Sequence, residues 1–99
     1  MQSSDNNEID DLVAPLVSFR RDIHANPELA YEEHRTAKKI AEALSELGLE
    51  VHTGIGRTGL VASLKVGNSD RTIGLRADMD ALPIHEETGL PYASRNPGV

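Results

Sequence analysis

The spacing of apolar residues predicts a helix near the start of the chain. Apolar side chains recur there at helical intervals: Ile9, Leu12, Val13, Leu16 and Ile23. Pro15 lies inside this stripe, and a proline within a helix removes a backbone hydrogen bond and clashes with the preceding turn. We therefore expect the helix to begin near residues 11–14, with a longer helix that kinks at Pro15 as the alternative. It should end at Asn26, because the residue before a proline is biased away from the α conformation.

A second helix is predicted from about Glu32 to the residues before Gly48. An i, i+3, i+4, i+7 stripe marks its buried face: Ala37, Ile40, Ala41, Leu44 and Leu47. Glu32 and Glu33 then fall in the first turn, where carboxylates complement the helix dipole. Gly48 suits the left-handed position that commonly ends a helix.

Three segments after the second helix have the alternation or the β-branched content of strands: 49–53, 60–66 and 72–77. The turn between the first two contains Gly54-x-Gly56-x-x-Gly59, which matches a dinucleotide-binding fingerprint. That mechanism needs a helix directly after the glycines, whereas a strand-like run follows here. We interpret the glycines as a strand-to-strand turn.

Two helices followed by three strands predict an α/β layer with an incomplete sheet, because so few strands leave unpaired edges. Residues 1–8 are polar and acidic, and we expect them to be disordered, so that the folded portion spans residues 9–99. Residues 78–99 are rich in loop signals. A loop of that length is unusual in a compact domain unless it is functional or the domain is incomplete.

The composition limits the partners. A formal net charge of -6 disfavours nucleic acid and anionic membrane surfaces, which select basic patches. No stretch approaches the roughly 20 apolar residues of a membrane span, and the polar start does not have the pattern of a signal peptide. Because there is no cysteine, we expect no disulfide, thiolate zinc site or cysteine nucleophile in these residues. The prediction is a cytoplasmic protein.

The segment from Arg76 to Pro83 carries the strongest candidate chemistry, an Asp-x-Asp pair directly after an apolar run. Open α/β sheets bind ligands beyond the carboxyl ends of their strands, so Asp78 and Asp80 are candidates for the edge of an active site. Such carboxylates bind divalent metals, orient a ligating imidazole or tune a proton acceptor. A pair of solvated loop acids is the simpler interpretation, and the two stay open at this point.

The histidines are weaker candidates. His24, late in the first helix, is interpreted as a cap or a packed side chain, although pairs of histidine and acid also hold metals. His85 with Glu86 and Glu87 has the composition of a ligand set, and a solvated acidic loop explains it equally well. Two further histidines lie at positions predicted to be exposed and receive no role: His34 and His52.

Several motifs together resemble the start of metal-dependent amidohydrolases, the aminoacylase and carboxypeptidase relatives that include hippurate hydrolases, N-acyl-amino-acid amidohydrolases and auxin-conjugate hydrolases. The resemblance covers residues 16–99 and rests on these motifs in order: Phe19-Arg20-Arg21-Asp22-Ile23-His24-x-x-Pro27-Glu28-Leu29-x-x-x-Glu33, Thr36-Ala37, Gly48-Leu49-Glu50-Val51, Thr58-Gly59-Leu60-Val61-Ala62 and Leu75-Arg76-Ala77-Asp78-Met79-Asp80-Ala81-Leu82-Pro83-Ile84. It implies the N-terminal part of a di-metal peptidase-like catalytic domain.

The resemblance implies a hydrolase that cleaves the amide between an acyl group and an amino acid, with two divalent metal ions (Zn, Mn, Co or Ni). Its partner would be a small N-acyl amino acid or a related amide, and a homodimer is one assembly that the resemblance allows. Asp80 would be the carboxylate that orients the metal site. Asp78 stands where many relatives have a histidine ligand, so the chain is similar to a subgroup that takes its ligands from a later Cys-Gly-His motif.

In that subgroup the Cys-Gly-His motif follows an Asn-Pro-Gly-Val sequence like residues 96–99, and the general-base glutamate comes later still. The resemblance therefore implies an N-terminal fragment that has no activity of its own. It places no metal ligand within residues 1–99 and puts the ligands beyond Val99. A free-standing, non-catalytic α/β interaction module is the rival interpretation.

Overall fold

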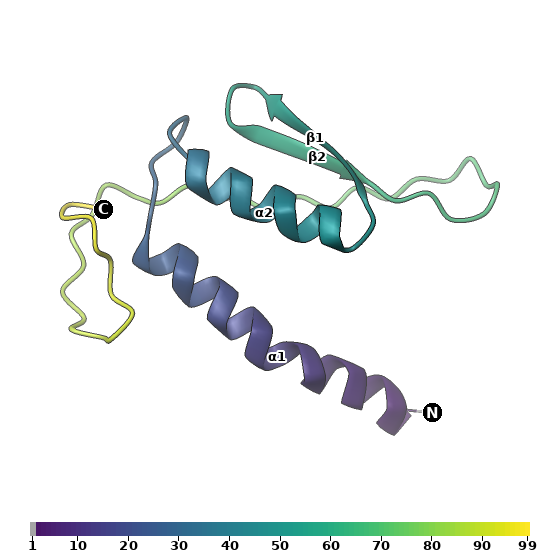
Figure 1. Cartoon of the computed structure of the whole chain (residues 1–99), viewed down its shortest axis with the longest axis horizontal. Helices are drawn as coiled ribbons and strands as arrows, with labels where there is room; N and C mark the ends of the chain where they lie inside the picture. Colours follow the sequence, from purple (N-terminus) through teal and green to yellow (C-terminus); the bar gives the residue numbers. More distant parts are fainter. Residues whose placement is uncertain (1) are drawn as a thin grey trace. The chain divides into compact units, whose positions relative to one another are not determined.

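The computed structural model describes residues 2–99, with side chains from residue 7 onward. It contains two helices, α1 (Gln2–Ala25) and α2 (His34–Glu46), followed by two strands, β1 (Glu50–Ile55) and β2 (Gly59–Ser63) (Figure 1). These elements belong to two units. One unit is residues 28–82, with α2 and both strands, and the other comprises α1 and the loop of residues 83–99.

α1 is a continuous helix that passes through Pro15. The predicted start near residues 11–14 is therefore wrong, and residues 2–8, which we expected to be disordered, belong to its first turns. A proline inside a helix lacks the N–H that would reach the carbonyl four residues earlier, here that of Asp11, and its ring crowds the same carbonyl. Because Asp11 is exposed, water can solvate that carbonyl and the helix can continue.

The apolar stripe of α1 is largely exposed. The accessible fractions are 61% for Ile9, 56% for Leu12, 51% for Val13 and 60% for Leu16. The predicted end of the helix is confirmed, because α1 stops at Ala25, directly before Asn26. Neither helix of the described chain has the length and the apolar character needed to cross a membrane.

α2 begins later than the sequence predicted. Its N-cap residue is Glu33, so the two glutamates at 32 and 33 precede the first turn, and the Glu33 side chain makes no cap bond. The carboxylate of Glu28 caps the helix in its place: it accepts hydrogen bonds from the N–H groups of Arg35 (3.1 Å) and Thr36 (2.6 Å). Two of the free N–H groups at the helix start are thereby satisfied.

The predicted glycine cap at the end of α2 is confirmed. Gly48 has a φ of 85°, in the left-handed region. Its N–H donates to the carbonyl of Ser45 (3.0 Å), and the N–H of Leu49 donates to the carbonyl of Leu44 (3.2 Å). This pair of bonds is a Schellman motif, which turns the chain from α2 into β1.

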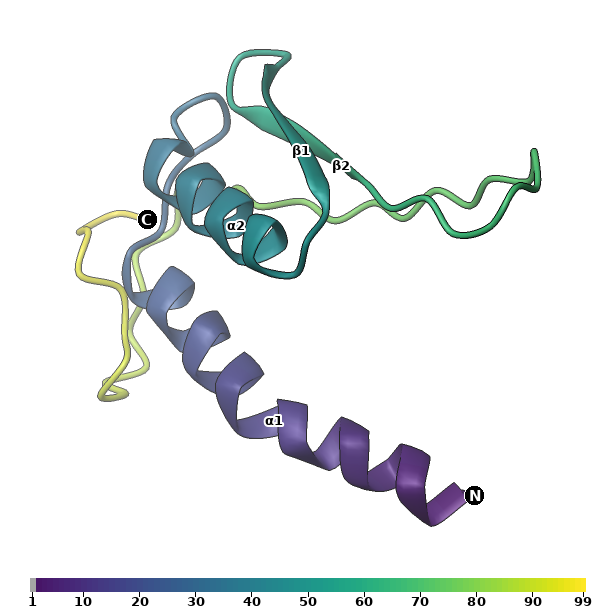
Figure 2. The same cartoon turned by 45° about the vertical axis from the view of Figure 1, so that its right-hand side comes forward.

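β1 and β2 form an antiparallel hairpin that lies along α2 in both views (Figures 1 and 2). The register pairs Glu50 with Ser63 and Thr53 with Leu60. The first two predicted strands are thus confirmed, with shifted ends.

The glycine-rich segment is the hairpin turn that we predicted. The register shifts between Thr53 and Ile55, so Gly54 is the extra residue of a β-bulge. Gly56 (φ 57°) and Arg57 (φ 86°) then reverse the chain. Two central residues with positive φ match the twist of a tight hairpin.

The prediction of a third strand at residues 72–77 is wrong. Within residues 2–99 the sheet has two strands, and this stretch joins neither. Ile73 and Leu75 are 87% and 96% exposed. A strand needs ladder hydrogen bonds to a neighbour, which β propensity alone does not supply. The coarser prediction, two helices followed by an incomplete sheet, is confirmed.

Candidate functional site

Asp78 and Asp80 line a groove of about 400 Å³ within residues 28–82. Three parts of this unit form its walls: Ala30, Tyr31 and Glu33 before α2, residues of the hairpin turn and its flanking strand ends (55, 56 and 58–60), and residues 76–80. The Asp-x-Asp pair and the hairpin turn thus line the same groove. The segment that precedes the pair is an extended loop and not the third strand that we predicted.

Both aspartates of the pair face solvent. The side chain of Asp78 is 75% exposed, and its Oδ1 accepts a long hydrogen bond of 3.3 Å from Nη2 of Arg76, itself 90% exposed. Such an exposed pair contributes little free energy. Asp80 is also exposed, and the N–H of the next residue, Ala81, is anchored by a 2.8 Å hydrogen bond to the carbonyl of Glu28. Within this segment the backbone after Asp80 is held, whereas the carboxylates are open to a ligand.

A buried hydrogen bond joins two walls of the groove. The hydroxyl of Thr58 donates to Oε1 of Glu33 at 2.9 Å, and the two residues are only 8% and 7% exposed. A buried carboxylate is costly unless it is hydrogen-bonded, so this contact stabilises the approach of the turn to the start of α2. This contact was not predicted from the sequence. Glu33 and Thr58 both belong to the motifs that carry the resemblance, and this was the one indication of it that the sequence offered.

Glu28 connects the start of α2 to the residue that follows Asp80. Its carboxylate caps the helix through Arg35 and Thr36, while its backbone carbonyl holds Ala81. Burial opposes ionisation of this carboxyl, but its interactions with Thr36 and the hydrogen bonds from the N–H groups of Thr36 and Arg35 outweigh it and hold the pKa of Glu28 below its ordinary value. Glu28 is therefore an ionised cap at neutral pH.

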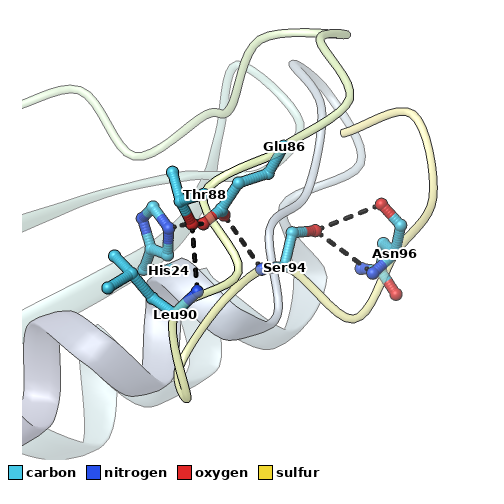
Figure 3. A network of polar contacts seen from close by, with 6 residues as sticks. All are labelled: His24, Glu86, Thr88, Leu90, Ser94 and Asn96. Atoms are coloured by element: carbon cyan, nitrogen blue, oxygen red, sulfur yellow. Dashed lines mark hydrogen bonds and ion pairs between the residues drawn. The ribbon is translucent and has the colours of Figure 1, made fainter.

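A second polar cluster lies in the unit of α1 and residues 83–99 (Figure 3). Nε2 of His24 lies 2.8 Å from Oε1 of Glu86, and the same oxygen accepts the N–H of Ser94 at 2.9 Å. The hydroxyl of Thr88 donates to the other oxygen, and this hydrogen bond is the main cause that lowers the pKa of Glu86. Glu86 thus holds the loop against the end of α1, and His24 is a partner in that contact.

His85 does not join this cluster. Its Nδ1 accepts the N–H of Gly98 at 3.2 Å, and Glu87 is exposed. The three residues 85–87 therefore do not converge as ligands. His34 and His52 are exposed, as predicted.

The described side chains do not assemble a metal centre by themselves. Among the side chains of residues 7–99 no three groups from histidine, cysteine, aspartate and glutamate gather closely enough to hold an ion. In the groove, one oxygen of Glu33 is already bonded to Thr58, and the carboxylates of Asp78 and Asp80 remain. Two exposed carboxylates are fewer ligands than a closed divalent site requires.

Residues 96–99, the Asn-Pro-Gly-Val sequence, form a turn in the unit of α1. The N–H of Val99 donates to the carbonyl of Asn96 at 3.1 Å, and the side-chain amide of Asn96 donates to the carbonyl of Pro27 at 2.8 Å. The turn is thereby tied to the residues that follow α1. The metal ligands that the resemblance places beyond Val99 lie outside the described residues, so their position stays a prediction.

No protein-family model matches the chain. Its structure is similar to the crystal structure of the YXEP protein of Bacillus subtilis, a dinuclear metal-binding peptidase of the M20 family, with a TM-score of 0.83 and 40% identity over 90% of this chain and 25% of that one. The chain is thus a homologue of the metal-dependent M20 hydrolases, and its helices and hairpin match the N-terminal part of an M20 peptidase domain.

Individual relatives are named as a hydrolase and as a carboxypeptidase. Hippurate hydrolase of Campylobacter jejuni is 54% identical over 92 residues, which cover 93% of this chain and 24% of the relative. Thermostable carboxypeptidase 2 of Saccharolobus solfataricus is 42% identical over 94 residues, 94% of this chain and 24% of the relative. The chain spans about a quarter of the length of the curated relatives it matches.

Proposed function

We propose that this chain is the N-terminal segment of a metal-dependent amidohydrolase that cleaves the amide bond of N-acyl amino acids. The observation that carries the proposal is the 54% identity to a hippurate hydrolase across 93% of the chain. Hippurate is itself an N-acyl amino acid, the amide of benzoic acid with glycine. The groove lined by Asp78 and Asp80 supports the proposal, because it gives the Asp-x-Asp pair a concave surface where a small amide can lie.

In this proposal Asp80 orients the metal site and Asp78 lies on its rim. Two divalent ions, Zn, Mn, Co or Ni, supply the Lewis acidity that amide hydrolysis needs. We propose that the metal ligands and the general base lie beyond Val99, in the three quarters of the relatives that this chain does not match, and that the 99 residues alone are inactive.

The proposed location is the cytoplasm, and the absence of cysteine from these residues is compatible with a reducing compartment. Cell fractionation tests this: recovery of the protein with an exported fraction would contradict it. A homodimer is the proposed assembly of the whole enzyme, and size-exclusion chromatography with light scattering measures it directly.

A chimera tests the function. This chain replaces the matched quarter of the Campylobacter jejuni hippurate hydrolase, and hippurate hydrolysis is measured before and after removal of metal with a chelator. We expect metal-dependent activity within about tenfold of the parent enzyme, because a segment of the same fold and role should restore the site. The matched control is the same chimera with Asp80→Asn.

The informative failure is a chimera that folds with the parent's circular dichroism and binds metal but hydrolyses no N-acyl amino acid. That result would reject the enzymatic proposal and favour the non-catalytic interaction module.

A further inference from the structure

Two residues other than glycine have a positive φ in the described chain, and they contact each other. Tyr31 (φ 66°) precedes α2, and Arg57 (φ 86°) lies in the hairpin turn. The guanidinium carbon of Arg57 is 5.0 Å from the centroid of the Tyr31 ring, within the range of a cation–π contact. An aromatic and a long cationic side chain are unusual choices for this backbone, where glycine or asparagine is the favoured residue.

An exposed cation–π contact is weak, so it does not by itself explain two strained residues. Strain of this kind is retained where the surrounding structure enforces it, and it concentrates at functional sites. Here the buried bond from Thr58 to Glu33 enforces it: Thr58 follows Arg57 directly, and Glu33 lies two residues after Tyr31. The segment before α2 and the hairpin turn are thereby joined by two neighbouring contacts, one between Tyr31 and Arg57 and one between Glu33 and Thr58.

The Tyr31 ring is available to a ligand. Tyr31 is 62% exposed and lines the groove that also contains Asp78 and Asp80. Arg57 lines a different groove, on the side of α2, so its guanidinium orients the ring without filling the space beside the aspartates. The volume of about 400 Å³ lies within the usual range for small-molecule sites.

The charged side chains of the groove have both signs, since Arg76 lines it together with Asp78 and Asp80. The exposed Tyr31 ring is an apolar surface in the same groove, against which the uncharged acyl group of an N-acyl amino acid can lie. A flat aromatic acyl group gains most, because aromatic rings stack or meet edge to face with a tyrosine ring.

We propose that Tyr31 is a specificity-determining residue that contacts an aromatic acyl group of the substrate, and that Arg57 is a positioning residue that orients the Tyr31 ring. This inference rests on the proposed function and deepens it, since it assigns discrimination between acyl groups to a named side chain.

The test compares two substrates, N-benzoylglycine and N-acetylglycine, in the whole enzyme that contains this chain or in the chimera, with Tyr31→Ala, Tyr31→Phe and Arg57→Gln as the variants. We expect Tyr31→Ala to lower the ratio of kcat/KM for the benzoyl over the acetyl substrate roughly tenfold, chiefly through KM. Tyr31→Phe keeps the ring and should change the ratio less than about twofold. Arg57→Gln should shift the ratio in the direction of Tyr31→Ala, by a smaller factor.

A residue that only supports the fold would lower both activities equally and leave the ratio unchanged. An unchanged ratio in Tyr31→Ala, with both substrates still hydrolysed, overturns the role of Tyr31 and leaves the proposed function intact. If the wild-type protein hydrolyses neither substrate nor any other N-acyl amino acid, the proposed function fails and this inference fails with it.

Discussion

Glu33 and Thr58 lie 25 residues apart in the sequence, yet the hydroxyl of Thr58 donates a 2.9 Å hydrogen bond to the carboxylate of Glu33 with both side chains buried. The bond fixes the hairpin turn beside the start of α2. It therefore sets the geometry of the groove that Tyr31 and the two aspartates line.

Loss of this bond should destabilise the protein markedly. In Thr58→Val the buried carboxylate of Glu33 loses its donor, and hydrogen bonds to charged groups contribute about 1.5–3 kcal/mol, so we expect a decrease of that size in the free energy of unfolding. Thr58→Ser retains the hydroxyl and is the matched control. Urea denaturation of both variants measures the difference. Equal stability of the two would show that the hydroxyl contributes nothing.

The Glu28 cap should contribute to α2 in the manner of other helix caps. Glu28→Ala removes both acceptors from the helix start and should cost about 1 kcal/mol of the free energy of unfolding. Glu28→Gln keeps a single acceptor oxygen and should cost less. Amide hydrogen exchange at Arg35 and Thr36 reports the cap directly, because their N–H groups are its donors. Unchanged protection of both amides in Glu28→Ala would contradict this role.

Acid should weaken the same cap. The folded-state pKa of Glu28 is lowered from the ordinary value of 4.5, so its stabilising contribution is complete above that pH and is lost as the pH falls through the folded pKa. Glu28→Gln cannot ionise and should show a smaller loss of stability on acidification. A pH series of urea denaturation compares the two, with Glu86→Gln run in parallel because the pKa of Glu86 is lowered as well.

The hairpin turn should not accept a side chain at Gly59. A Cβ placed there would lie 2.6 Å from the backbone oxygen of Ile55, which cannot move without opening the turn. We expect Gly59→Ala to cost about 1–3 kcal/mol, as overpacking does elsewhere. The control is Gly74→Ala, where a Cβ meets no atom within 4 Å and φ is not positive. Thermal unfolding of the two variants should separate them, and equal melting temperatures would argue against a tight turn.

The two aspartates should differ in their effect on activity. In the intact protein or the chimera, Asp80→Asn should lower kcat/KM by about 10–100-fold, the usual effect of changing a carboxylate that orients metal ligands. Asp78→Asn should have a smaller effect, because Asp78 is proposed to lie only on the rim of the metal site, and its carboxylate makes only a long contact of 3.3 Å with Arg76. Metal titration accompanies the kinetics, since Asp80→Asn should also weaken metal binding. A larger loss in Asp78→Asn would reverse the proposed roles.

The features predicted from sequence are those that depend on near neighbours. The cap of α2 at Gly48, the end of α1 and the hairpin turn all depend on residues within a few positions of one another, whereas Leu47, which we assigned to the buried face of α2, is 74% exposed. The motif order that indicated a resemblance to metal-dependent hydrolases is also a property of the linear sequence, and the similarity to a dinuclear metal-binding peptidase of the M20 family bears out that resemblance.

The tertiary structure decided the features that depend on distant partners. Residues 72–77 have the composition of a strand, but a ladder needs a neighbour that propensity cannot supply. Glu33 bonds to a residue 25 positions away, and His24 bonds to Glu86, 62 positions away. Local periodicity carries no information about such partners, because the entropy of loop closure and the packing of whole elements determine which distant side chains meet.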